Sequence, residues 1–209
     1  MSTPSGASGL LAGAISYTLG VCALVAPGEM ALPTPCTDWD LGTLLGHLAD
    51  SMADLEVAIR TGHLDLEPPR DLVVTGAAVT GPAGDDPVEV LRDRAAQLLC
   101  ASYGDVGPER FVAVGGLPMP AGLVACAGAV EIAVHGWDVS AASGGARPIP
   151  AGLAARLLRL CPLLVAGREG LFAAPVQVPA QASPGDRLVG YLGRRPRNAP
   201  ADRDAVTGE

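Results

Sequence analysis

The stretch "EIAVHGWDVS", residues 131–140, places ionisable side chains inside an otherwise apolar segment. Glu131 and His135 are four residues apart, and Asp138 follows Glu131 by seven, so a helix would carry all three on one side. A buried carboxylate without a partner costs free energy or takes up a proton. We therefore expect a compensating partner for this column of side chains.

A divalent cation is one such partner, because a Glu oxygen and a neutral imidazole nitrogen are both ligands for zinc and related ions. A third ligand must come from elsewhere, and the other histidines of the chain are His47 and His63. His47 lies inside a predicted helix, whereas His63 follows Gly62 in a predicted loop, so His47 is the stronger candidate. Two histidines and one glutamate with an open fourth position are typical of catalytic metal sites.

The same residues also have simpler interpretations. A Glu-x3-His pair is common as a solvated helix pair or a local hydrogen bond. Trp137 by itself is typical of core or rim packing, and Asp138 would serve equally to hold His135 or to cap a helix end. Cys36 is interpreted as a loop residue rather than a nucleophile, because no histidine lies near it in sequence to activate it.

Composition limits the class of protein. The 209 residues fit one domain with a continuous core, and a net charge of -8 disfavours binding to nucleic acid or to anionic lipid. Five scattered cysteines without CxxC pairs indicate reduced core thiols in a cytoplasmic protein. Residues 9–26 carry no charge, but no Lys or Arg precedes them as in a signal peptide. We expect there a soluble helix that forms a subunit interface or lines an apolar cavity.

Apolar side chains recur at helical spacing in several segments that Pro, Gly and Asp residues separate. Thr37 and Asp40 have capping-box spacing at the start of one such segment, and Asp86 followed by a proline marks the start of another. The predicted helices cover residues 8–26, a second segment from the capping box at 37–40 to 62, a third segment from 86, 119–143 and, shorter, 151–163, with a last one opening at 183–186.

The connector between the second and third predicted helices is long. Residues 63–85 are rich in Pro and Gly and only briefly strand-like, at "LVVTGAAV". Antiparallel neighbours need only about two to eight residues, so this length favours a crossover between parallel helices and the order up, down, down, up. The sequence therefore predicts an all-α four-helix bundle as a single domain over residues 1–194, with short C-terminal helices, an extended segment at "PVQVPAQA" and a mobile polar tail at 195–209.

Three stretches, "PTPCTDWDLGTLLGHL", "EIAVHGWDVSAASG" and "DRLVGYLGRRP", together resemble one family. They are similar to motifs of the DinB-like metal-dependent proteins, in the branch of the N-terminal domain of mycothiol-dependent maleylpyruvate isomerase. The resemblance implies a four-helix bundle with a long second connection and metal ligands at His47, Glu131 and His135. It also implies that the metal lowers the pKa of a low-molecular-weight thiol, here mycothiol, and presents the thiolate to an electrophile.

We therefore expect a metal-dependent enzyme for thiol transfer to, or isomerisation of, an electrophilic small molecule. The expected metal is zinc, with nickel, iron and manganese as alternatives. Asp138 is expected to support the ligand His135, and Trp137 to pack the helix and shape the cavity that binds the cofactor. Residues 145–209 are short for the additional C-terminal domain of the isomerase, and few arginines lie near the motifs. We therefore expect an apolar electrophile rather than maleylpyruvate.

Other functions are open on the sequence alone. One alternative is a cyclase or isomerase of specialised metabolism that uses the bundle cavity on an apolar substrate without a thiol or without a metal. Another is a non-catalytic binding or stress-response protein. As partners we expect a second copy of the chain, through the helix at residues 8–26, and no nucleic acid or membrane.

Overall fold

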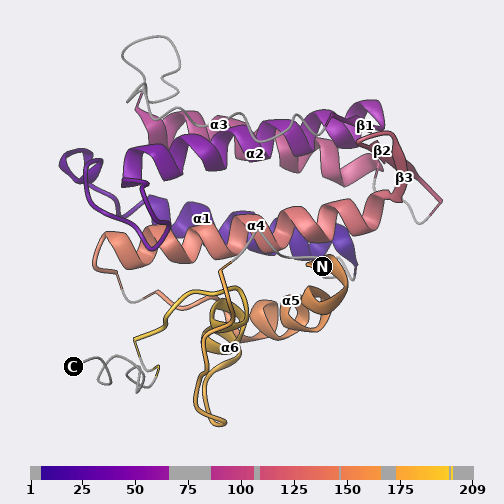
Figure 1. Cartoon of the computed structure of the whole chain (residues 1–209). Helices are drawn as coiled ribbons and strands as arrows, with labels where there is room; N and C mark the ends of the chain where they lie inside the picture. Colours follow the sequence, from indigo (N-terminus) through magenta and orange to yellow (C-terminus); the bar gives the residue numbers. More distant parts are fainter. Residues whose placement is uncertain are drawn as a thin grey trace. The chain divides into compact units, whose positions relative to one another are not determined.

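The computed structural model describes residues 6–65, 86–105, 109–145, 147–165, 173–197 and 199. The chain divides into two compact units, Met1–Arg147 and Pro148–Glu209. In the described part of the first unit, long helices form a bundle with one small sheet (Figure 1). The predicted all-α class is therefore confirmed, whereas the single domain over residues 1–194 stays a prediction. The strand-like stretch at 72–79 and residues 200–209 of the predicted tail lie outside the described residues.

The long helices of the first unit are α1 (Ala7–Cys22), α2 (Leu41–Thr61), α3 (Pro87–Asp105) and α4 (Ala121–Ala142). α1 packs most extensively against α4, and α2 against α3, which gives two layers of two helices (Figure 1). Ala7 at the start of α1 lies beside Gly122 at the start of α4. Further along, the Thr18 hydroxyl donates a hydrogen bond to the Ile132 carbonyl oxygen at 2.8 Å. α1 and α4 therefore run parallel.

The ends of α2 follow from local hydrogen bonding. Asp40 precedes the helix, and its carboxylate accepts a hydrogen bond from the Thr43 amide at 2.8 Å. Gly62 ends the helix with a left-handed φ of 74°, a conformation that glycine adopts at little cost. The predicted end at Gly62 is confirmed, whereas the predicted start is too early, because the cap is Asp40 rather than the Thr37 of the expected capping box.

A small sheet joins the ends of α2 and α3. β1 (His63–Leu64) follows α2 and pairs in parallel with β2 (Phe111–Val114), which follows α3. β2 also pairs antiparallel with β3 (Leu117–Pro120), which leads into α4. α2 and α3 therefore end at the same end of the bundle, where α4 begins. This is the order up, down, down, up that the long connector predicts.

The β2–β3 hairpin corrects the predicted start of α4. The sequence predicts a helix from residue 119 and no hairpin. Gly115 and Gly116 instead turn the chain with φ values of 55° and 81°, the left-handed conformations that a tight hairpin turn requires. Met119 then pairs with Val112 on the neighbouring strand, so the chain stays extended and α4 begins at Ala121.

The uncharged helix α1 is packed into the first unit. Leu11 and Ile15 are fully buried, and the backbone of α4 at Gly136 closely approaches Thr18 of α1. α4 is the one described helix that is long and apolar enough to cross a membrane, but most of that stretch is buried inside the unit. Such burial is typical of the core helix of a soluble protein.

All five cysteines lie in the described part of the chain and carry thiols rather than disulfide bonds. Cys22, Cys126 and Cys161 are buried, and burial raises the pKa of the Cys22 thiol to about 12. Cys100 is exposed on α3, and Cys36 is half-buried. The expectation that all five are core residues is therefore wrong for these two.

The second unit contains α5 (Ala151–Leu164) and α6 (Pro184–Tyr191). Ser183 caps α6 by accepting a hydrogen bond from the Asp186 amide at 3.1 Å, as its sequence predicts. The segment before α6 belongs to no described strand, but its Val176 amide donates to a carbonyl oxygen of α6. The short C-terminal helices are therefore confirmed.

Candidate metal centre

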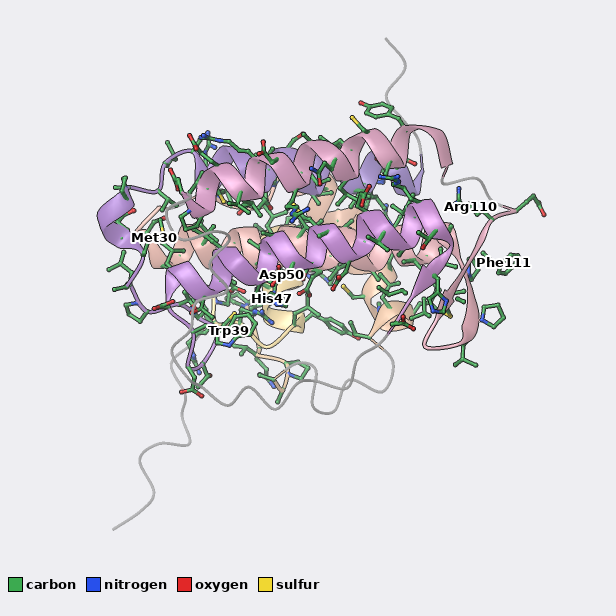
Figure 2. All side chains as sticks on the ribbon, turned by 90° about the horizontal axis from the view of Figure 1, so that it is seen from above. Met30, Trp39, His47, Asp50, Arg110 and Phe111 are labelled. Carbon is green, nitrogen blue, oxygen red and sulfur yellow. The ribbon has the colours of Figure 1, made fainter. Side chains whose placement is uncertain are left out.

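Three predicted ligands meet where the first half of α2 faces α4. His47 Nε2 lies 2.9 Å from Glu131 Oε1, and His135 Nε2 lies 3.1 Å from the same oxygen. One donor atom from each residue lies within 4.8 Å of the others, a spacing at which the three could hold one metal ion. Figure 2 shows His47 on α2 with Trp39 beside it. The structure brings together the three side chains that the spacing selects.

Helix packing explains the convergence. Glu131 and His135 are one turn apart on α4, so they project from the same side. α2 runs antiparallel to α4, because Leu55 lies against Gly128 while His47, further back on α2, lies against Glu131. A Cβ atom at Gly128 would overlap the Leu55 side chain. This close approach of the two helices lets an imidazole of one reach the carboxylate of the other.

The centre lies at the edge of the buried core. The side chain of His135 is 9% exposed, whereas those of His47 and Glu131 are 35% and 33% exposed. Burial alone would raise the pKa of Glu131, but hydrogen bonds with the two imidazoles outweigh it and hold that pKa below its ordinary value. Burial would lower the pKa of His135, but its hydrogen bonds, that with Asp138 first among them, hold the pKa well above its ordinary value.

Asp138 supports His135 on the side away from Glu131. It is fully buried, and its Oδ2 lies 3.0 Å from His135 Nδ1. Because an ionised carboxylate can only accept, the proton of the neutral imidazole belongs on Nδ1, which leaves the lone pair on Nε2. A metal-binding histidine commonly donates its other ring nitrogen to a carboxylate in this way. The predicted supporting role of Asp138 is consistent with this geometry.

The donor set fits a divalent metal ion. Two imidazole nitrogens and a carboxylate are ligands of zinc, nickel, iron and manganese. Among the described residues a second group, Cys36, His135 and Asp138, also has donor atoms within 4.8 Å of one another. In that group Asp138 already accepts hydrogen bonds from the other two side chains. The group of His47, Glu131 and His135 is therefore the candidate centre.

Trp39 is a residue of the centre that spacing alone does not select. Its ring centroid lies 4.7 Å from that of His47 and 6.1 Å from that of His135. The half-buried indole therefore covers one side of both imidazoles. The available signal was its position in "CTDWD", just before α2 and inside one of the stretches that carry the family resemblance.

Cys36 also reaches the centre. Its Sγ lies 3.7 Å from His135 Nδ1 and 3.3 Å from Asp138 Oδ2, although the cysteine is about a hundred residues away in sequence. The fold therefore supplies the histidine neighbour that the local sequence lacks. The interpretation of Cys36 as a plain loop residue loses its basis.

Residues 33–40, which we call the 33–40 loop, carry both Cys36 and Trp39. Pro33 and Asp40 pair as an isolated bridge at its two ends. Inside it the Thr34 hydroxyl donates to the Trp39 carbonyl oxygen at 2.9 Å and accepts from the Cys36 amide at 3.1 Å. These bonds fix the path of the loop immediately before α2.

Two other residues considered in the sequence lie elsewhere. Trp137 follows His135 by two positions on α4, so its side chain leaves the helix roughly 200° further round. Its predicted role in cofactor binding stays a prediction. His63 lies in β1, where it is exposed and pairs with Asp65 at 2.9 Å. It is separated from His47 by roughly 20 Å along α2.

Comparison with known proteins gives one family match. Residues 11–140, well over half of the chain, match the family described as "Mycothiol maleylpyruvate isomerase N-terminal domain". No curated protein and no solved structure matches the chain significantly. The matched residues include the 33–40 loop, α2 and nearly all of α4. The family is associated with mycothiol-related, metal-dependent function. The chain therefore belongs to the DinB-like family of the mycothiol maleylpyruvate isomerase N-terminal domain.

Proposed function

We propose that the protein is a metal-dependent enzyme that activates a low-molecular-weight thiol for transfer to, or isomerisation of, an electrophilic small molecule. The observation that carries the proposal is the convergence of His47 and His135 on one oxygen of Glu131, at 2.9 and 3.1 Å. Membership of the family supports mycothiol as the thiol.

Zinc is the proposed metal, and nickel, iron and manganese accept the same ligands. His47, Glu131 and His135 would hold it, and three protein ligands leave room for a fourth ligand from solution. When bound, the metal would lower the pKa of a coordinated thiol, so that a thiolate forms near neutral pH.

The chain's own residues orient and shield the reacting groups. Buried Asp138 fixes the ring of His135 through Nδ1. The indole of Trp39 covers both imidazoles and excludes water from that side. The partly exposed side chains of His47 and Glu131 leave the centre accessible to small molecules.

The electrophile is proposed to be apolar. A net charge of -8 disfavours an anionic substrate. The two helices that carry the ligands contain no lysine and a single arginine, Arg60, at the far end of α2, where it pairs with Glu56 at 2.9 Å. A carboxylate clamp of arginines is therefore missing from these helices.

For the surroundings of the enzyme we propose a cytoplasmic location and a homodimer through the uncharged helix α1, without nucleic acid or membrane as partner. The acidic net charge supports the exclusion of nucleic acid. Analytical ultracentrifugation tests the dimer, and a monomer at all concentrations contradicts it.

Elemental analysis of the purified protein, followed by an activity screen with and without mycothiol, tests the proposed function. We expect about one divalent ion per chain and turnover of electrophiles only when both metal and thiol are present. Activity that persists in chelator without thiol would favour a cyclase or isomerase acting on an apolar substrate. Metal binding without turnover across the panel of electrophiles would favour a binding protein.

A further inference from the structure

We propose that Cys36 is a positioning residue of the metal centre, which acts on His135 through Asp138. The inference rests on the proposed function, because it takes His135 Nε2 as a metal ligand. It assigns to the thiol a structural task at the centre rather than that of a nucleophile.

The distances define which way the hydrogen bonds run. Asp138 Oδ2 lies 3.0 Å from His135 Nδ1 and 3.3 Å from Cys36 Sγ, and Sγ lies 3.7 Å from Nδ1. A carboxylate accepts only, so both neighbours donate to it: the imidazole through its N–H and the cysteine through its S–H. One carboxylate oxygen is therefore held by two donors from different parts of the chain.

Burial makes this second donor matter. Asp138 is 0% exposed, so water cannot take the place of a missing donor without rearrangement. Without the thiol, the Asp138 carboxylate loses one hydrogen-bond donor and is held less firmly in its orientation toward His135 Nδ1. The ring of His135 then loses part of the support that aims Nε2 at Glu131, and metal affinity falls.

The position of the thiol is itself set by the 33–40 loop. The Cys36 amide donates to the Thr34 hydroxyl at 3.1 Å, and the loop is closed by the pairing of Pro33 with Asp40. Asp40 also caps α2, the helix that supplies His47. The loop therefore positions Cys36, which supports the ligand His135, relative to the start of α2, which carries the ligand His47.

Cobalt(II) titration, followed by the visible absorption of the bound ion, tests this role without reference to activity. We expect Cys36→Ala to weaken cobalt affinity by about tenfold, the lower range for residues that hold a metal ligand in place. Cys36→Ser should stay within about threefold of the wild type, because a hydroxyl can also donate to Asp138. Unchanged affinity in Cys36→Ala, or equal loss in both variants, overturns the proposal.

A double-mutant cycle shows whether the thiol acts through Asp138. In an Asp138→Ala background the acceptor is gone, so a further Cys36→Ala change should leave cobalt affinity unaltered. Independent, additive losses overturn the proposal. Circular dichroism melting verifies that each variant is folded, and Cys100→Ala, which removes an exposed thiol of α3, is the matched control.

The same titration separates this inference from the proposed function. If the wild type binds no cobalt, both are wrong. If the wild type binds cobalt and Cys36→Ala binds it equally well, only the role of Cys36 is wrong.

Discussion

Two histidine–carboxylate pairs in the described part of the chain have the same spacing of 2.9 Å, His47 with Glu131 and His63 with Asp65. The first pair joins α2 to α4, is about one-third exposed and meets a third donor, His135. The second pair spans two residues at the end of α2, with side chains 52% and 82% exposed.

A short distance between an imidazole and a carboxylate is therefore not enough to make a metal site. An exposed pair such as His63–Asp65 is worth about 0–1 kcal/mol and is easily replaced by water. At the other pair, two packed helices hold three donors together, and the buried carboxylate of Asp138 fixes one of them, His135, through its Nδ1 atom. The candidate centre therefore differs from the exposed pair in two ways: three donors converge, and Asp138 holds one of them. A substitution can remove either feature separately.

Removal of a ligand should give the largest effect. His135→Ala deletes one donor and the contact with Asp138, so we expect metal affinity to fall by at least about 100-fold, beyond the range known for supporting residues. His63→Ala should leave metal content unchanged. Elemental analysis after dialysis measures both, and equal loss in the two variants would show that the pair at the end of α2 belongs to the metal site.

Removal of the supporting charge should have a smaller effect. Asp138→Asn keeps the shape of the side chain but removes its charge, so we expect metal affinity to fall by about 10- to 100-fold. Asp65→Asn is the matched change at the exposed pair and should have no effect. Competition with a chromogenic chelator measures both affinities. A wild-type affinity in Asp138→Asn would contradict the supporting role.

A change in the spacing between helices should have the next largest effect. The metal centre depends on packed helices, whereas the exposed His63–Asp65 pair does not. A Cβ atom at Gly136, next to His135, would meet the Thr18 side chain and lie 3.2 Å from its Cα on α1. We expect Gly136→Ala to destabilise the metal-free protein by about 1–3 kcal/mol.

The matched control is Gly122→Ala, another glycine of α4 that faces α1. Its added Cβ would lie 3.7 Å from the Ala7 Cβ, an ordinary contact. We expect it to be neutral or to stabilise by up to about 1 kcal/mol, because alanine favours a helix more than glycine does. Urea denaturation compares the two variants, and equal stability would contradict the tight packing at Gly136.

The pH dependence should be the smallest effect. Because the pKa of His135 in the folded, metal-free protein lies well above its ordinary value of 6.5, its protonation adds stability that is complete below pH 6.5. That stability is lost as the pH rises through the folded pKa. With metal bound the sign reverses, because protons compete with the metal and its stabilisation grows as the pH rises.

Melting temperatures measured in chelator and in zinc, from below pH 6.5 upward, check the prediction. In chelator the melting temperature should fall as the pH rises above 6.5, and in zinc it should rise over the same range. His135→Gln should remove the loss at high pH in chelator, while His63→Gln should retain it. A loss that survives in His135→Gln must come from another group.

Local patterns were sufficient for most of the helices. The apolar spacing along α2 and its end at Gly62 are signals within a few residues, although the capping-box spacing placed the start at Thr37 and not at Asp40. The same holds for Glu131 and His135, whose common side depends only on the helical repeat. The β2–β3 hairpin was also encoded locally, by Gly115 and its neighbouring glycine, but the extended strands are too short for apolar spacing to separate them from α4.

The helical segments, the bundle order implied by the long connector and the types of side chain available as ligands could all be predicted from the amino-acid sequence. Those properties depend on spacing between near neighbours. The contacts of Trp39 with the two imidazoles and of Cys36 with His135 and Asp138 are evident only in the folded structure. These contacts join a loop to a helix about a hundred residues later, and only the packing of α2 against α4 brings them within hydrogen-bond distance.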